Sequence, residues 1–93
     1  MAYPPPNIVG HGAEQMRLIC FSRLAPERRR VAGYSSAGPG PREIAGMAVC
    51  QNDDGYYLFS CDAEWNVMFD SLCATLDDAI SDSGHEWVYP KTK

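Results

Sequence analysis

The sequence has no apolar run close to the roughly 20 residues that a membrane-spanning helix needs. Residues 1–10 lack the positive charge followed by an apolar stretch that marks a secretory signal, so we expect a cytoplasmic protein. The chain also contains no phosphate-binding loop, dinucleotide fingerprint or serine elbow. What remains is a small chain of 93 residues, 45% of them hydrophobic, and this composition predicts a single folded domain.

No two of the four cysteines stand in a C-x-x-C pair. In a reducing cytosol such residues are usually small buried hydrophobic groups rather than disulfide partners. We therefore expect buried free thiols at Cys20, Cys50, Cys61 and Cys73.

A catalytic or metal site has little support in the sequence. Cys61 and Asp62, followed by His85, form the one group that could be nucleophilic. A working cysteine needs a cleft and a nearby base, and Cys61 falls on the predicted core face. The spacing of His11, His85 and the cysteines matches no zinc pattern. We expect no catalytic residue, no metal and no cofactor.

Negative charge is concentrated in the second part of the chain. The net charge of −4 divides into +3 over residues 1–48 and −7 over residues 49–93. An acidic domain repels nucleic acid phosphates, so its charge either keeps it in solution or attracts a basic protein. We expect neither nucleic acid nor a membrane as a partner. The candidate interaction surface consists of Asp53, Asp54, Asp62, Glu64, Asp77, Asp78 and Asp82.

The first part of the chain has little regular pattern. Residues 1–14 contain three consecutive prolines and two glycines, which indicates a flexible N-terminal tail. Residues 15–93 are expected to form one small domain with a Gly/Pro-rich loop at residues 33–42. Within it, residues 16–24 carry apolar side chains at both parities, which favours a strand with both faces partly covered.

The strongest local signal is a hairpin around Asp54-Gly55. The flanking runs, residues 46–51 and 56–61, have strand character, and an Asp-Gly pair suits a tight turn. If these two residues are central, the core face carries three facing pairs, which are Tyr57 with Asn52, Phe59 with Cys50, and Cys61 with Ala48.

A third strand is expected at residues 67–72. An odd-numbered loop before it would place Val67 and Phe69 on the same face as Cys61, whereas an even-numbered loop would expose core aromatics. We favour the odd loop, with Asn66 in the left-handed conformation and Asp62 capping the turn through its side chain.

One short helix follows. Thr75 is a good N-cap and Gly84 a natural stop. Residues 86–89 then form either an edge strand or a tail packed through Trp87. The predicted fold class is α+β, an antiparallel β-meander of three to four strands packed against one short α-helix. Because both sheet faces are apolar and one helix covers one face, the other needs either residues 16–24 or a second subunit.

A pattern in the second part of the chain resembles that of short, uncharacterised bacterial proteins. It comprises Tyr56-Tyr57-Leu58-Phe59-x-Cys61-Asp62-x-x-Trp65-Asn66-Val67, followed by Thr75-Leu76-x-Asp78-Ala79. The resemblance covers residues 56–79, implies a bacterial accessory gene and supports the hairpin, hairpin, helix order. It brings no catalytic residues with it.

Two functional hypotheses follow. The first is a non-enzymatic interaction module, expected to be a homodimer, whose acidic face binds a basic protein; an immunity-like or inhibitor role is one version of it. The alternative is a small-molecule-binding protein or minor enzyme with a pocket between sheet and helix. Its lining would be the aromatic residues Tyr57, Trp65, Phe69 and Trp87, which are equally suited to a core.

Overall fold

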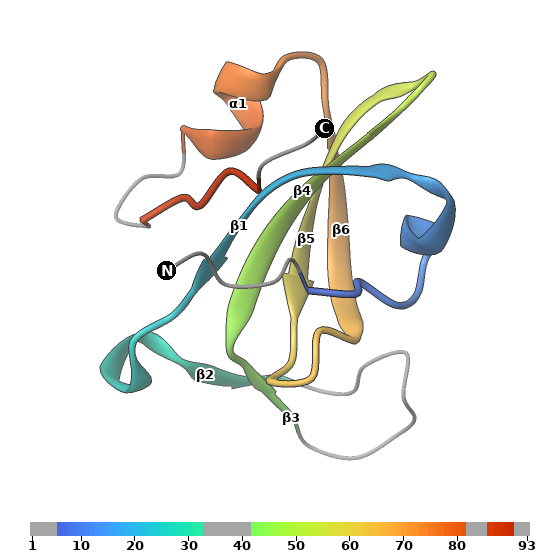
Figure 1. The fold of residues 1–93 in the computed structure, drawn as a ribbon. Helices are drawn as coiled ribbons and strands as arrows, with labels where there is room; N and C mark the ends of the chain where they lie inside the picture. Colours follow the sequence, from blue (N-terminus) through green and yellow to red (C-terminus); the bar gives the residue numbers. More distant parts are fainter. Residues whose placement is uncertain (1–5, 33–41, 82–85, 91–93) are drawn as a thin grey trace.

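A four-stranded antiparallel sheet in the order β1-β4-β5-β6 forms the centre of the molecule (Figure 1). This computed structural model describes residues 6–32, 42–81 and 86–90. The four strands are β1 Arg17–Arg23, β4 Gly46–Asn52, β5 Gly55–Cys61 and β6 Val67–Cys73. A second, two-stranded sheet pairs β2 Arg30–Ala32 with β3 Arg42–Ile44. The helical elements are η1 Ala13–Gln15, η2 Pro26–Arg28 and α1 Leu76–Ile80. The predicted α+β class, with a β-meander and one short α-helix, is confirmed.

The turn between β4 and β5 lies one residue earlier than predicted. Its central residues are Asp53 and Asp54, and Asn52 lies opposite Gly55 rather than opposite Tyr57. The Asn52 side chain accepts a hydrogen bond from the Asp54 amide at 2.8 Å. Gly55 takes a φ of 137°, which glycine adopts more readily than other residues. This local hydrogen bond and the placement of the glycine after the turn account for the difference.

The strand faces nevertheless remain as predicted. Moving the turn by one residue shifts the register by two, and side chains alternate with a period of two. The predicted core face is therefore confirmed, with the facing pairs Cys50 and Tyr57, Ala48 and Phe59, and Gly46 and Cys61.

The pairing of β6 with β5 is only partly as predicted. The loop at residues 62–66 is odd-numbered, and Val67 lies buried opposite Cys61 as expected. The expectation for Phe69 is wrong, because a register shift between Ser60 and Cys61 places Phe69 opposite Ser60, away from the core face. A bulge inserts one extra residue, so every later side chain of β6 changes face. Phe69 is consequently 51% exposed.

Each face of the sheet has its own cover. On one face, α1 packs over Cys20 and Val49 with its buried Ala79. On the other, the segment preceding β1 contributes Ile8 and Ala13 to the core (Figure 1). The sequence assigned residues 1–14 to a flexible tail, whereas residues 6–14 lie packed on the sheet. Residues 16–24 do form a strand, but β1 lies within the sheet beside β4 and covers neither face.

Both outer strands of the sheet have short additional partners. Val9 forms a parallel bridge with Asn66, just before β6. Val88 forms an antiparallel bridge with Phe21 of β1, and the neighbouring Trp87 packs into the cluster under α1. The segment after the helix therefore combines both of its predicted alternatives, a short edge pairing and a packed tryptophan.

The helix α1 begins as predicted and ends early. Thr75 is the N-cap, and its hydroxyl oxygen accepts a hydrogen bond from the Asp78 amide at 3.1 Å. The helix ends at Ile80, ahead of the predicted stop; Gly84 lies outside the described residues, as does most of the predicted loop at 33–42. None of the helices in the described part of the chain is long and apolar enough to cross a membrane.

Candidate interaction surface

The acidic residues proposed as one surface lie at two ends of the sheet. Asp53 and Asp54 are exposed at the β4–β5 turn, and Asp77 and Asp78 are exposed in the first turn of α1. Asp62 and Glu64 belong to the β5–β6 turn, at the opposite end of β5. Asp82 lies outside the described residues. The predicted set is therefore not a single face.

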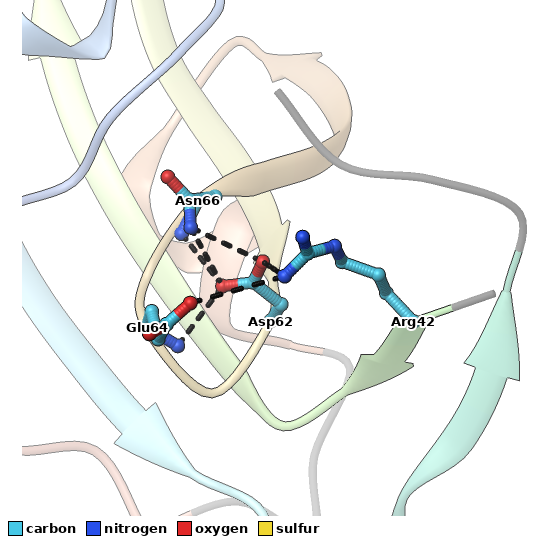
Figure 2. A network of polar contacts seen from close by, with 4 residues as sticks. All are labelled: Arg42, Asp62, Glu64 and Asn66. Atoms are coloured by element: carbon cyan, nitrogen blue, oxygen red, sulfur yellow. Dashed lines mark hydrogen bonds and ion pairs between the residues drawn. The ribbon is translucent and has the colours of Figure 1, made fainter. Parts of the chain in front are cut away.

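Asp62 is a buried carboxylate that organises the β5–β6 turn (Figure 2). Its Oδ1 accepts hydrogen bonds from the backbone amides of Glu64 and Asn66, each at 2.9 Å. The side-chain Nδ2 of Asn66 lies 3.3 Å from Oδ1 and 3.2 Å from Oδ2. Arg42 Nη1 lies 3.4 Å from Asp62 Oδ2 and 3.8 Å from the Glu64 carboxylate. The predicted turn cap at Asp62 is confirmed.

This network has a structural purpose. A buried carboxylate is costly unless it is paired and hydrogen-bonded, and here backbone amides and a guanidinium meet both needs. Arg42 belongs to β3, so its ion pair ties the two-stranded sheet to the β5–β6 turn. With its oxygens engaged in this way and only 4% of its surface exposed, Asp62 is not available to a partner.

Trp65, rather than Asn66, takes the left-handed conformation in this turn, with φ 66°. Asn66 is held in place by Asp62 and by its bridge to Val9. The Trp65 ring meets Phe21 edge-on at 5.8 Å, and the Arg23 guanidinium lies 5.1 Å from its centroid. Trp65 is therefore a core residue whose ring packs under a cation.

The four predicted pocket aromatics do not converge. Tyr57 stacks on Phe59 with ring centroids 5.9 Å apart, and Trp65 lies on the same face of the sheet. Trp87 packs on the other face with α1, and Phe69 is exposed. Two of these residues therefore lie on the face away from the helix, and the four line no common space between helix and sheet.

The buried cysteines are poor nucleophiles. Cys20, Cys50 and Cys61 are almost fully inaccessible. Burial raises the pKa of Cys20 to about 11 and those of Cys50 and Cys61 to about 12, so all three thiols are protonated near neutral pH. These residues, like the partly buried Cys73, are free thiols.

One long-range polar contact had no local signal in the sequence. His11 Nδ1 lies 2.8 Å from Asp70 Oδ2, and both side chains are partly exposed. His11 itself has a φ of 53° between two glycines with positive φ. The contact joins the segment that covers one face to the middle of β6.

Strand β6, with the turn and the helix at its C-terminal end, exposes apolar and acidic residues that we together call the acidic edge. Leu72 is 58% exposed, and a Cβ at Gly55 would lie 3.5 Å from its Cδ1, so the β4–β5 turn lies against it. The helix α1 follows β6 directly and packs against it. The acidic edge comprises the exposed residues Asp53, Asp54, Phe69, Asp70, Leu72, Asp77 and Asp78. Sequence reasoning missed its apolar part because the β-bulge in β6 was not foreseen.

No protein-family model, curated protein or solved structure matches this chain. The acidic edge is therefore interpreted from its own chemistry.

Proposed function

We propose that the protein is a non-enzymatic interaction module whose acidic edge binds a basic partner protein. One observation carries this proposal: the outer strand β6 exposes two large apolar side chains, Phe69 and Leu72, together with Asp70, and four more exposed carboxylates lie in the β4–β5 turn and in α1, at the C-terminal end of this strand. Exposed apolar groups rimmed by polar residues are typical of protein-binding surfaces.

The carboxylates and the apolar side chains of the acidic edge contribute in different ways, and together they favour a basic partner. The carboxylates attract a basic surface and select against acidic ones, while Phe69 and Leu72 supply apolar area that a partner can bury. An immunity-like or inhibitor role, in which these acids cover the basic surface of a toxin or nuclease, is one concrete form. A bacterial accessory gene, as the resemblance implies, would suit that role. The free, buried thiols suit the reducing environment of a cytoplasm.

The homodimer expected from the sequence stays a prediction, although its original reason is gone. That reason was an uncovered apolar sheet face, and the segment containing Ile8 and Ala13 covers it from within the chain. Light scattering at micromolar concentration tests the dimer: a mass close to 10.3 kDa contradicts it, and twice that mass supports it.

The proposal is tested with two charge-matched variants used as baits in affinity capture from a bacterial lysate. Each removes four negative charges, so both bring the net charge from −4 to zero. The edge variant combines Asp53→Asn, Asp54→Asn, Asp77→Asn and Asp78→Asn. The control variant combines Glu27→Gln, Glu43→Gln, Glu64→Gln and Glu86→Gln, all at exposed positions that are not part of the acidic edge.

We expect wild type and the control variant to retain the same basic proteins in low salt, and the edge variant to lose them. Equal losses from both variants would mean that net charge alone drives capture. Retention by the edge variant would show that the partner binds elsewhere. Either result contradicts the proposal.

A further inference from the structure

We propose that the basic partner binds as an extended segment that adds to the sheet as a new strand along β6, between Phe69 and Cys73. This inference rests on the proposed function and names the conformation of the partner. Strand β6 is the outermost in the sheet order, and residues 69–72 are all exposed. Among the described residues, β5 is the only strand paired with this stretch.

The molecule already accepts an added segment at the beginning of the same edge. The Val9 amide donates to the Trp65 carbonyl at 3.0 Å, and the Val67 amide donates to the Val9 carbonyl at 2.8 Å. The outer side of β6 at Val67 is therefore hydrogen-bonded to a segment that is not part of the main sheet. Because the amides and carbonyls of an edge strand continue along it, the edge beyond Val67 offers the same kind of partner groups.

The intramolecular segment stops short for a conformational reason. Gly10, His11 and Gly12 all have positive φ, at 113°, 53° and 82°. This run turns the chain into η1, whose Ala13 packs in the core. The His11 contact holds the turn beside Asp70 of β6. That contact joins two side chains, so it uses no backbone group of the edge.

Natural edge strands are commonly protected by charged residues, proline, β-bulges or a covering element. The β-bulge of β6 precedes Phe69, and the stretch from Phe69 to Cys73 contains no lysine or proline. Here the exposed stretch carries Phe69 and Leu72, and the two lie on opposite faces of the sheet because Phe69 pairs with Ser60 and Leu72 with Tyr57. An added strand, whose side chains alternate between faces, would contact both.

Charge selects the occupant of this edge. A second copy of the chain would bring its own five carboxylates against those of the acidic edge, which is unfavourable. A strand that alternates apolar and basic residues would meet the apolar side chains and also pair with the carboxylates. We therefore assign the edge to a basic partner segment rather than to self-association.

The probe is a short synthetic peptide of alternating valine and lysine. Two matched peptides accompany it: one with glutamate in place of lysine, and one with the lysine sequence but N-methylated at every residue, so that neither edge can donate hydrogen bonds. Binding is followed through the amide resonances and hydrogen exchange of residues 69–73.

We expect the lysine peptide to bind and to slow amide exchange in residues 69–73, and both matched peptides to bind at least about tenfold more weakly. Phe69→Ser and Leu72→Ser should each weaken the lysine peptide by roughly tenfold, because an anchoring apolar group is lost. Val31→Ser is the control, since Val31 is an exposed apolar residue of the separate β2–β3 sheet and should have no effect. Unchanged amide dispersion verifies that each variant is folded.

Four outcomes would overturn the inference. Equal binding of the N-methylated lysine peptide would mean that charge alone recruits the partner, which leaves the proposed function intact. Failure of the lysine peptide to bind, or equal binding of the glutamate peptide, would remove the basic strand as occupant. Protection of residues 69–73 that rises with protein concentration without peptide would assign the edge to a second copy.

Discussion

Replacement of Ile8 by alanine gives a direct test of whether the N-terminal segment belongs to the fold. Ile8 is 5% exposed and packs in the cluster that contains Phe21, Phe59 and Trp65. If residues 6–14 were a flexible tail, removing this side chain would leave the folded state unchanged. If they cover the sheet, the substitution leaves a cavity against the core.

The expected magnitude follows from the burial. Replacing a buried isoleucine by alanine costs about 2–5 kcal/mol, depending on how far the site can collapse. Ile8 lies in an irregular segment that can relax, so we expect a loss of about 2–3 kcal/mol. A chain of this size has a free energy of unfolding of about 5–14 kcal/mol. Each kcal/mol shifts the Tm of such a domain by about 4–8 °C, so the Tm should fall by about 8–24 °C.

The measurement is urea denaturation followed by tryptophan fluorescence, with thermal unfolding by circular dichroism as a second readout. Val31→Ala is the matched control, because this side chain is 70% exposed and should change stability by less than about 0.5 kcal/mol. If Ile8→Ala changes the free energy of unfolding as little as Val31→Ala does, the N-terminal segment does not cover the sheet and the description of the fold is wrong.

Four further predictions concern the core, the Asp62 network and the thiols. Gly46→Ala should lower the free energy of unfolding by about 1–3 kcal/mol through overpacking, because a Cβ there would lie 2.7 Å from the Trp65 ring. Combining it with Trp65→Leu should recover part of this loss. Strictly additive effects of the two substitutions in denaturation would contradict the clash. Asp62→Ala should lower the free energy of unfolding by about 2–4 kcal/mol, because two backbone amides lose their acceptor and Arg42 loses its partner. A loss of stability no greater than that of Glu64→Ala would refute the role of the network. Alkylation at pH 8 should modify Cys73 quickly and the other cysteines only after unfolding. Burial raises the pKa of Cys50 and Cys61 from 9.0 to about 12, so the unfolded chain loses these protons at a lower pH than the folded protein. The contribution of these thiols to stability should therefore be full below about pH 9 and fall between pH 9 and 12. Denaturation midpoints that stay constant up to about pH 11 would contradict this.

Much of the sheet could be predicted because its signals are local. The Asp-Gly pair marked the hairpin and, through its register, the strand faces, and Thr75 marked the start of α1. Even an error of one residue at the turn preserved the faces, because the resulting register shift was even. The turn cap at Asp62 is also local, since it acts on amides two and four residues away.

The parts that could not be predicted depend on distant contacts or on a single inserted residue. The bulge in β6 exposes Phe69, and β6 carries apolar residues at both parities, so alternation does not reveal it. The burial of Asp62 depends on Arg42, which arrives from another sheet. The cover supplied by Ile8 depends on the pairing of Val9 with Asn66, across most of the chain. The candidate acidic residues lie at two ends of the sheet, because Asp53 and Asp54 precede β5 whereas Asp62 and Glu64 follow it.

The two outer bridges of the sheet also bear on the order in which the chain folds. The β4–β5 and β5–β6 pairings close short loops, whereas the bridges at Val9 and Val88 join residues far apart in the sequence. Contacts of such long range form slowly, because much of the chain must be ordered before they can be made. During synthesis, Ile8 leaves the ribosome early but finds its place only after β6 has emerged. It thus meets solvent before the apolar side chains of the sheet do, and it is among the last to be buried.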